Sequence, residues 1–234
     1  MRRLGSLEIV DLAARLLGPF CDEVVFVGGA ILVFLISEPA ARRPRTTDDA
    51  DVIVEARTKL EYQAIERKLR ELGFQHDQFG LICRFLHSGL SLNVMPVNEE
   101  VLGFSNQWHH MCLNDTKSKI TPEGRAVRVI SSPCFLACKM DAFRSLGRNG
   151  AGDPLASRDF EDVISVLDGC SELEAEMQTC PPEIKSYLAA QARLLLAERE
   201  IAFSVECCLD PDIYSQSRCG YIMARLKWIA SLTE

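Results

Sequence analysis

The sequence predicts an α/β (α+β) protein, with a mixed β-sheet flanked by helices and a helical C-terminal part. Short apolar runs alternate with helical patterns through the first 130 residues, and helical spacing alone continues after them. The chain has 234 residues, of which 47% are hydrophobic, so it can bury a sizeable core. We therefore divide it into residues 1–131, an α/β domain, and residues 132–234, a helical domain that completes the same cleft.

Composition excludes several classes of protein. The net charge of −7 argues against a general nucleic-acid coat protein, although a local basic groove remains compatible with it. The longest apolar run, Val24–Ile36, is too short to span a membrane and carries two glycines. Glu8 stands where a secretory signal needs its apolar centre, so we expect a cytoplasmic protein with no membrane partner. The 10 cysteines form no CxxC pair or zinc spacing, which favours reduced, buried thiols.

The first elements surround a pair of glycines. Apolar residues at helical spacing predict a helix over Leu7–Leu17. The apolar run Val24–Val27 predicts a strand, which ends at Gly28-Gly29, and the run Ala30–Ile36 has the length of a helix. The loop Glu38–Arg45 then leads into an acidic strand that ends at Val52–Val54.

A helix and three strands follow in the α/β part. The stripe of apolar residues in Thr58–Leu72 predicts an amphipathic helix, with Gly73 after its end. Two strands, Ile82–Leu86 and Leu90–Val97, are joined by a short link that suits a hairpin. A polar turn precedes a further strand at Ala126–Ile130.

Helical spacing continues through the second part. The predicted elements are Pro133–Leu146 with Ser132 as its N-cap, a helix capped by Ser157 with Phe160, Val163, Ile164 and Leu167 as its buried stripe, a possible short helix within Asp168–Cys180, Glu183–Phe203, and Ser217–Leu232.

The glycines and the acidic strand together indicate metal and phosphate chemistry. Gly28 and Gly29 allow backbone N–H groups to approach an anion closely, and a helix start just after them favours negative charge. Asp49 and Asp51 are two apart on a strand, so they share one face and can hold a hard cation such as Mg²⁺. Each half alone is more commonly a plain turn or a solvated strand end. A structural α/β domain with a coincidental acidic strand is the remaining alternative.

These motifs resemble a known family. Gly28-Gly29 followed by Arg45-x-Thr47-x-Asp49-x-Asp51 resembles the nucleotidyltransferases of the DNA polymerase β superfamily, and more narrowly the AbiEii/AbiGii toxin-type enzymes of bacteria. The resemblance implies a polymerase β-like sheet, Mg²⁺ as the cofactor and a nucleoside triphosphate as the substrate. It implies that Asp49 and Asp51 bind the metal, and that Gly28, Gly29, Arg45 and Thr47 contact the nucleotide.

Two later segments extend the resemblance. The helix segment from Cys134 to Phe143 is similar to the family's lysine helix, which implies that Lys139 meets the nucleotide phosphates. Arg158–Val163 resembles its last motif, with Asp159 as a base or as the partner of a basic group. From the residues alone, a mid-helix lysine is ordinarily solvated, and acids in a first turn commonly serve the helix dipole. Asp159 and Asp162 are expected on the face opposite the buried stripe.

One position departs from the family pattern. On the second hairpin strand Ser91, Asn93 and Met95 face one way, and the family would commonly carry Asp at the position of Asn93. An amide can offer one oxygen to a metal, but it is neutral and cannot accept a proton. A catalytically weakened nucleotide-binding or regulatory protein, or an antitoxin partner, is therefore an alternative to an active enzyme.

The resemblance also suggests partners. Toxin-type relatives can act on the 3′ end of tRNA, so RNA is the expected acceptor and an antitoxin protein a possible partner, with protein nucleotidylation as the alternative. A metal site shared by His109 and His110 is not expected, because adjacent side chains point in different directions. Phe104 and Trp108 suit core packing better than base stacking.

Overall fold

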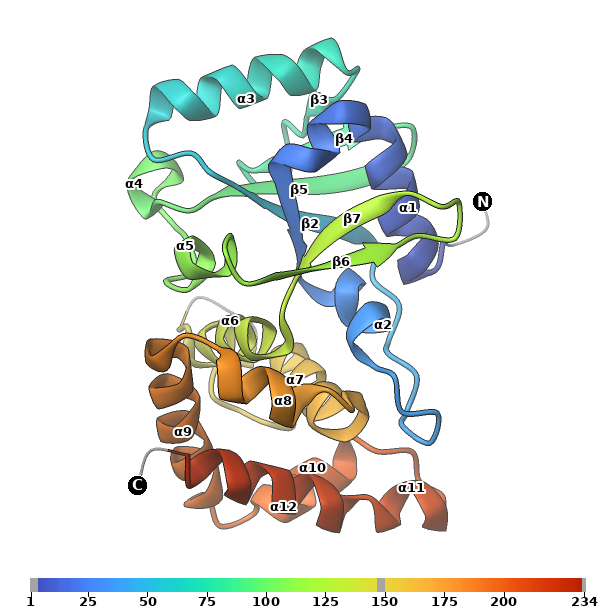
Figure 1. Cartoon of the computed structure of the whole chain (residues 1–234), viewed down its shortest axis with the longest axis vertical. Helices are drawn as coiled ribbons and strands as arrows, with labels where there is room; N and C mark the ends of the chain where they lie inside the picture. Colours follow the sequence, from blue (N-terminus) through green and yellow to red (C-terminus); the bar gives the residue numbers. More distant parts are fainter. Residues whose placement is uncertain (1–3, 147–149, 233–234) are drawn as a thin grey trace. The chain divides into compact units, whose positions relative to one another are not determined.

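The computed structural model describes residues 4–146 and 150–232, and the chain divides into two units (Figure 1). The first unit contains the residues up to Val33 together with Arg45–Ser131. The second contains Phe34–Pro44 and the residues from Ser132 on. The sequence-based division at residue 131 placed the short segment Phe34–Pro44 with the α/β part, whereas it belongs to the helical unit.

A mixed sheet forms the centre of the first unit, as predicted. Within the described residues it has seven strands in the order β3-β4-β5-β2-β1-β7-β6. Their bounds are β1 Val24–Val27, β2 Asp49–Val54, β3 Gln75–His76, β4 Arg84–His87, β5 Leu90–Pro96, β6 Thr116–Ile120 and β7 Ala126–Ile130. β2 runs parallel to β5 and antiparallel to β1, and β1 runs parallel to β7. The predicted mixed α/β fold is confirmed.

The strand register aligns four positions across the sheet. Asp51 on β2 is paired with Val27 on β1 and with Asn93 on β5. Asn93 is in turn paired with Arg84 on β4. Because paired residues lie side by side on the same face, this register brings an acid, an amide and a guanidinium together.

The register of the β4–β5 hairpin follows from its turn. Ser88 and Gly89 occupy the two central positions, with φ values of 50° and 82°. Positive φ at both positions is typical of the two-residue type I′ turn, which matches the twist of the strands. This turn pairs His87 with Leu90, and the ladder then places Arg84 opposite Asn93.

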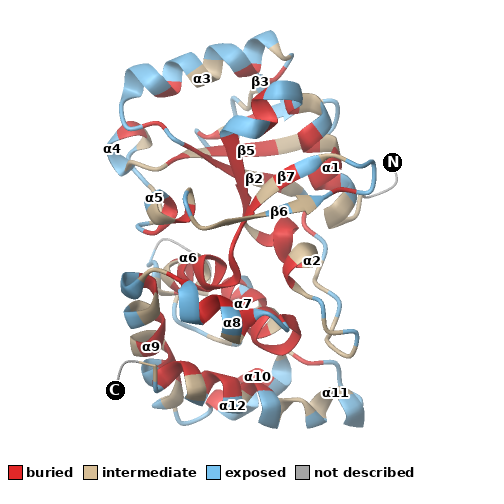
Figure 2. Ribbon diagram, in the orientation of Figure 1, coloured by how far each residue is buried: buried red, intermediate tan, exposed pale blue. Residues whose placement is uncertain are grey.

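Helices cover the sheet of the first unit. α1 (Ser6–Leu17) packs on β2 and β5 through its buried stripe. α3 (Lys59–Glu71) begins at Thr58, whose side chain accepts from the Glu61 backbone N–H at 3.2 Å, and Glu61 completes a capping box. Tyr62 Oη donates to the Val94 carbonyl at 2.8 Å and ties α3 to β5. Figure 2 shows the central strands as buried and the outer face of α3 as exposed.

Some elements before residue 131 differ from the prediction. The run Ala30–Ile36 was predicted as one helix, but it forms a 3₁₀ turn, η2 (Gly29–Ile31), and a single turn, α2 (Leu32–Leu35). The short strands β3 and β6 were not predicted. The remaining elements are η1 (Gly18–Glu23), α4 (Glu99–Leu102) and α5 (His109–Cys112).

The second unit is helical. Its elements are α6 Ser132–Arg144, α7 Arg158–Gly169, α8 Leu173–Thr179, α9 Pro182–Leu196, α10 Ile201–Cys207, α11 Ile213–Ser217 and α12 Cys219–Ala230. α6 packs against α7 and α9, and α12 packs against α9. The single helix predicted over Glu183–Phe203 is wrong, because α9 and α10 are separate. The last predicted helix, Ser217–Leu232, corresponds to α12, and the short α11 that ends at Ser217 was not predicted.

The start of α6 also differs from the prediction. Ser132 was expected to cap the helix, but it is the first helical residue, and its hydroxyl donates to Glu176 Oε2 at 2.7 Å. The same oxygen accepts from the Ser132 backbone N–H at 2.8 Å. A buried carboxylate from α8 therefore satisfies the N-terminus of α6, where the helix dipole favours negative charge.

The segment Phe34–Pro44 is fixed to the helical unit by its own contacts. The backbone N–H groups of Ser37 and Glu38 donate to the Gly169 carbonyl at 2.9 and 3.0 Å. Arg42 pairs with Glu161 at 3.0 Å and with Asp210 at 3.2 Å. A segment that follows β1 in the chain is thus bonded to α7 and to the turn after α10.

Two further predictions concern membranes and thiols. Among the described residues, every helix is too short or too polar to cross a membrane. All ten cysteines lie in the described part of the chain and carry free thiols, and six of them are buried.

Candidate functional site

The acidic pair lies on one face of β2, as predicted, and Asn93 connects its two members. Asn93 Nδ2 donates to Asp49 Oδ2 at 3.1 Å and to Asp51 Oδ1 at 2.8 Å. Asn93 is buried, whereas the side chain of Asp49 is 29% exposed. The amide therefore lies beneath the acidic pair and presents its N–H groups to both carboxylates.

Arg84 completes this cluster. Its Nε donates to Asn93 Oδ1 at 3.0 Å, and a terminal nitrogen donates to Asp49 Oδ2 at 3.2 Å. Arginine is only a donor, and ionised carboxylates are only acceptors, so the amide of Asn93 must face Arg84 with its oxygen. The sequence analysis did not identify Arg84. The hairpin register could have identified it, because a two-residue turn at Ser88-Gly89 places residue 84 opposite residue 93.

Gly28 lies against the acidic pair. Its φ of 72° is in the left-handed region, and a Cβ atom at this position would lie 2.1 Å from Asp51 Oδ2. Only glycine fits both conditions. Gly29 is buried and begins the 3₁₀ turn η2. The glycine pair predicted from the sequence thus allows a close approach between backbone and carboxylate.

Thr47 and Arg45 precede β2 in the chain. Thr47 is buried, and its Oγ1 donates to Asp49 Oδ1 at 2.9 Å. This hydroxyl orients the carboxylate of Asp49, and its contact with a nucleotide stays a prediction. Arg45 is half-buried at the beginning of the second stretch of the first unit.

A second cluster lies in the helical unit. Lys139 Nζ pairs with Asp159 Oδ1 at 2.9 Å and with Asp162 Oδ2 at 2.7 Å. The side chains of Lys139, Asp159 and Asp162 are 12%, 10% and 1% exposed. Lys139 therefore differs from an ordinary solvated mid-helix lysine, and the two acids are buried although they were predicted opposite the buried stripe of α7. Burial alone would lower the pKa of Lys139, but the charges of Asp162 and Asp159 outweigh it and raise the pKa above the usual value.

The predicted site residues therefore form two groups. Gly28, Thr47, Asp49, Asp51 and Asn93 lie together in the first unit, and Lys139 and Asp159 lie together in the second. The sharing of one cleft by these groups stays a prediction.

The acidic pair fits one Mg²⁺ ion better than two. Asp49 and Asp51 supply two carboxylates, the kind of ligand that Mg²⁺ prefers, and the glycine at position 28 leaves room for the carboxylate of Asp51 beside the backbone. Within the described ranges, no three His, Cys, Asp or Glu side chains are grouped so as to hold a metal. A second ion would need further negative charge, which the neutral Asn93 does not provide.

The thiol of Cys83, close to Asp51, does not fit as a metal ligand. Burial, followed by the charge of Asp51, raises the pKa of Cys83 to about 11, so its thiol stays protonated at neutral pH. His109 is buried and His110 is exposed, so the two adjacent side chains lie in different environments. Trp108 is buried, as expected for a core residue, whereas Phe104 is 41% exposed and does not pack in the core.

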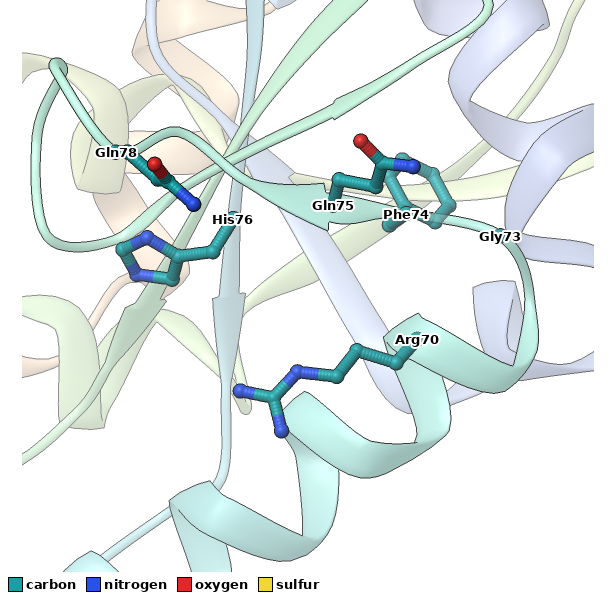
Figure 3. A pocket seen from close by; sticks show the side chains of 6 residues that line it. All are labelled: Arg70, Gly73, Phe74, Gln75, His76 and Gln78. Carbon is teal, nitrogen blue, oxygen red and sulfur yellow. The ribbon is translucent and has the colours of Figure 1, made fainter.

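A surface hollow lies beside β3, and none of the predicted site residues lines it. Figure 3 shows Arg70 at the end of α3, with His76 and Gln78 from β3 and the following turn around the hollow. The ring of His76 bonds the Ile82 carbonyl through Nε2 at 2.7 Å, so it stabilises this turn.

Comparison with known proteins adds no assignment. No protein-family model matches the chain, and no curated protein sequence matches it.

Proposed function

We propose that this chain is a Mg²⁺-dependent nucleotidyltransferase, which moves a nucleoside monophosphate from a nucleoside triphosphate to an acceptor. One observation carries the proposal. Asp49 and Asp51 lie on one face of β2, next to a Gly28 turn that has no space for a side chain. Bound Mg²⁺ supplies neutralisation of phosphate charge and orientation for in-line attack.

The residues of the first unit divide the work. Asp49 and Asp51 hold the metal, and Thr47 and Asn93 orient their carboxylates through bonds of 2.9 and 2.8 Å. Backbone N–H groups at Gly28-Gly29 donate to the triphosphate, which the small size of glycine allows to approach closely. Arg45 contributes positive charge to nucleotide binding.

The residues of the second unit act on phosphate and on proton transfer. Lys139 is the cationic partner of two carboxylates, so we assign it to positioning Asp159 as well as to meeting phosphate. Asp159 serves as a base or orients a basic partner, since Asn93 cannot take a proton.

The acceptor that we propose is RNA, at the 3′ end of tRNA. We also propose that the chain is the toxin of a toxin–antitoxin system, in which an antitoxin protein restrains it. Both proposals rest on the resemblance to AbiEii/AbiGii toxin-type enzymes. A protein acceptor is the alternative within the same superfamily.

A second candidate function is a nucleotide-binding or regulatory protein with weakened catalysis. The observation that favours it is the orientation of Asn93, which presents N–H donors to both carboxylates. A position that would commonly hold a proton acceptor holds a donor instead.

Calorimetry with each nucleoside triphosphate, with and without Mg²⁺, tests the binding site. We expect Mg²⁺-dependent binding that Asp49→Ala and Asp51→Ala weaken, while Glu55→Ala, just beyond the end of β2, leaves it unchanged. Absence of Mg²⁺-dependent binding in the parent protein contradicts both candidates. Labelled triphosphate with total RNA then separates them, because only the enzyme transfers label.

A further inference from the structure

The acidic site contains its own cation. Asp49 and Asp51 contribute two negative charges, and Arg84 places one positive charge 3.2 Å from Asp49 Oδ2. Asn93 is neutral and lies between them, in register with both Asp51 and Arg84. The cluster thus carries a net charge of −1 where three carboxylates would carry −3.

N–H donors occupy the Asn93 side of the acidic pair. Asp49 Oδ2 accepts from Arg84 at 3.2 Å and from Asn93 Nδ2 at 3.1 Å. A carboxylate oxygen has about two lone-pair positions, so these two donors use the acceptor capacity of this atom. The Asn93 oxygen faces Arg84, which removes it as a metal ligand beside the carboxylates.

The geometry points to Arg84 as a built-in cation that limits this site to a single divalent metal ion. In two-metal sites the ions lie about 3.5–4 Å apart and share carboxylates between them. Here the oxygen facing residue 93 is bonded to a guanidinium and an amide, and the negative charge needed for a second ion is absent. This inference deepens the proposed function, on which it rests for the phosphate ligands of the metal.

Arg84 also determines how strongly the single ion binds. A unit positive charge within a few ångströms repels a divalent cation, and the 26% exposure of Arg84 reduces this repulsion without removing it. Loss of the guanidinium therefore strengthens metal binding at the remaining carboxylate oxygens. Loss of the guanidinium together with gain of a carboxylate at position 93 creates room and charge for a second ion.

Mn²⁺ alone is a suitable probe, because electron paramagnetic resonance of the free ion counts what the full chain binds. We expect the parent to bind one Mn²⁺, and Arg84→Gln to bind one about tenfold more tightly, as removal of a nearby unit charge predicts. The double variant Arg84→Gln/Asn93→Asp should bind two. Arg84→Lys keeps the charge and should retain the parent's single, weaker ion.

Arg57→Gln is the matched control. Arg57 is an exposed arginine of the same unit and pairs with Glu55 at 2.9 Å, so its loss removes an ion pair outside the cluster. Three outcomes overturn the inference. The parent binds two ions, Arg84→Gln and Arg57→Gln bind Mn²⁺ with equal affinity, or no variant binds Mn²⁺. Melting curves confirm that each variant is folded.

A parallel titration with nucleoside triphosphate separates this inference from the proposed function. If neither the parent nor any variant binds triphosphate, while Mn²⁺ binding follows the expected pattern, the proposed nucleotidyltransferase function is rejected. The single-metal site is then kept. If the parent binds triphosphate and also binds two Mn²⁺ ions, the proposed function is kept and the single-metal inference is rejected.

Discussion

Arg84 donates from Nε to Asn93 Oδ1 at 3.0 Å across the β4–β5 hairpin, and Asn93 donates onward to Asp51 at 2.8 Å. The three residues form a chain of hydrogen bonds from guanidinium to amide to carboxylate. Bonds in such a chain polarise one another, so each member influences the next. A substitution at position 93 therefore changes both the acidic pair and its arginine.

Asn93→Asp is expected to raise nucleotide transfer. A carboxylate there can take the proton of an acceptor hydroxyl, and general-base assistance contributes roughly 10²–10⁴ in rate. Triphosphate affinity should change little, which calorimetry checks beside the transfer assay. The gain should vanish when Asp51→Ala is added. If the parent is already fully active and Asn93→Asp gives no gain, the general base lies elsewhere. Asp159 and Asp162 are then the next candidates.

Gly28→Ala is expected to cost more stability than a similar change at another glycine with a positive φ. The added Cβ would lie 2.1 Å from Asp51 Oδ2, so the carboxylate must move. Gly18→Ala is the control, because its φ of 54° and ψ of −133° also lie outside the αL well and nothing lies within 4 Å of the added atom. Backbone strain alone costs the control about 1–3 kcal/mol. Equal free energies of unfolding in urea for the two variants would show that Asp51 does not press on Gly28.

Lys139→Met is expected to destabilise the fold by about 3–5 kcal/mol, because it leaves two buried carboxylates without their cation. Lys68→Met is the control. Lys68 pairs with Glu23 at 2.6 Å, but the two side chains are 46% and 57% exposed, so its loss should cost less than about 1 kcal/mol. Equal changes in melting temperature for the two variants would show that Lys139 contributes no more to stability than a solvated lysine does.

His109 is expected to make stability depend on pH. Burial lowers its pKa from 6.5 to about 4, so between these values the unfolded chain binds a proton that the folded chain does not. Its contribution is present above pH 6.5 and is lost as pH falls towards 4, by about 3 kcal/mol in total. His109→Gln should flatten this part of the unfolding free-energy profile, whereas His110→Gln, at the exposed neighbour, should not. A profile unchanged by His109→Gln would contradict the shift.

The sequence was informative where local patterns decide structure. β1, the shared face of Asp49 and Asp51, the hairpin and the Ser157 cap all follow from period-two spacing or capping rules. Contacts between distant segments were not visible in these patterns. The periodicity of α7 placed Asp162 on a polar face, but Lys139, from a different helix, makes that face part of the interior.

The incorrect predictions of the α9–α10 break and of β6 have similar causes. Residues 197–200 are mostly good helix formers, so nothing local announces the break between α9 and α10. β6 is an edge strand in which Lys117 and Lys119 alternate with other polar residues, so it lacks the apolar signal of a strand. Tertiary packing decided both elements.

The segment Phe34–Pro44 has a consequence for biosynthesis. It leaves the ribosome before β2, yet Arg42 of this segment finds its partners at Glu161 and Asp210, late in the chain. The sheet is complete in sequence once β7 has emerged, so the first unit can fold around a loop that has no docking place yet. A chain that ends after residue 131 would therefore contain the basic segment Phe34–Pro44 without the residues that it contacts. We do not expect the two halves of the chain, divided at residue 131, to be stable as separately expressed domains.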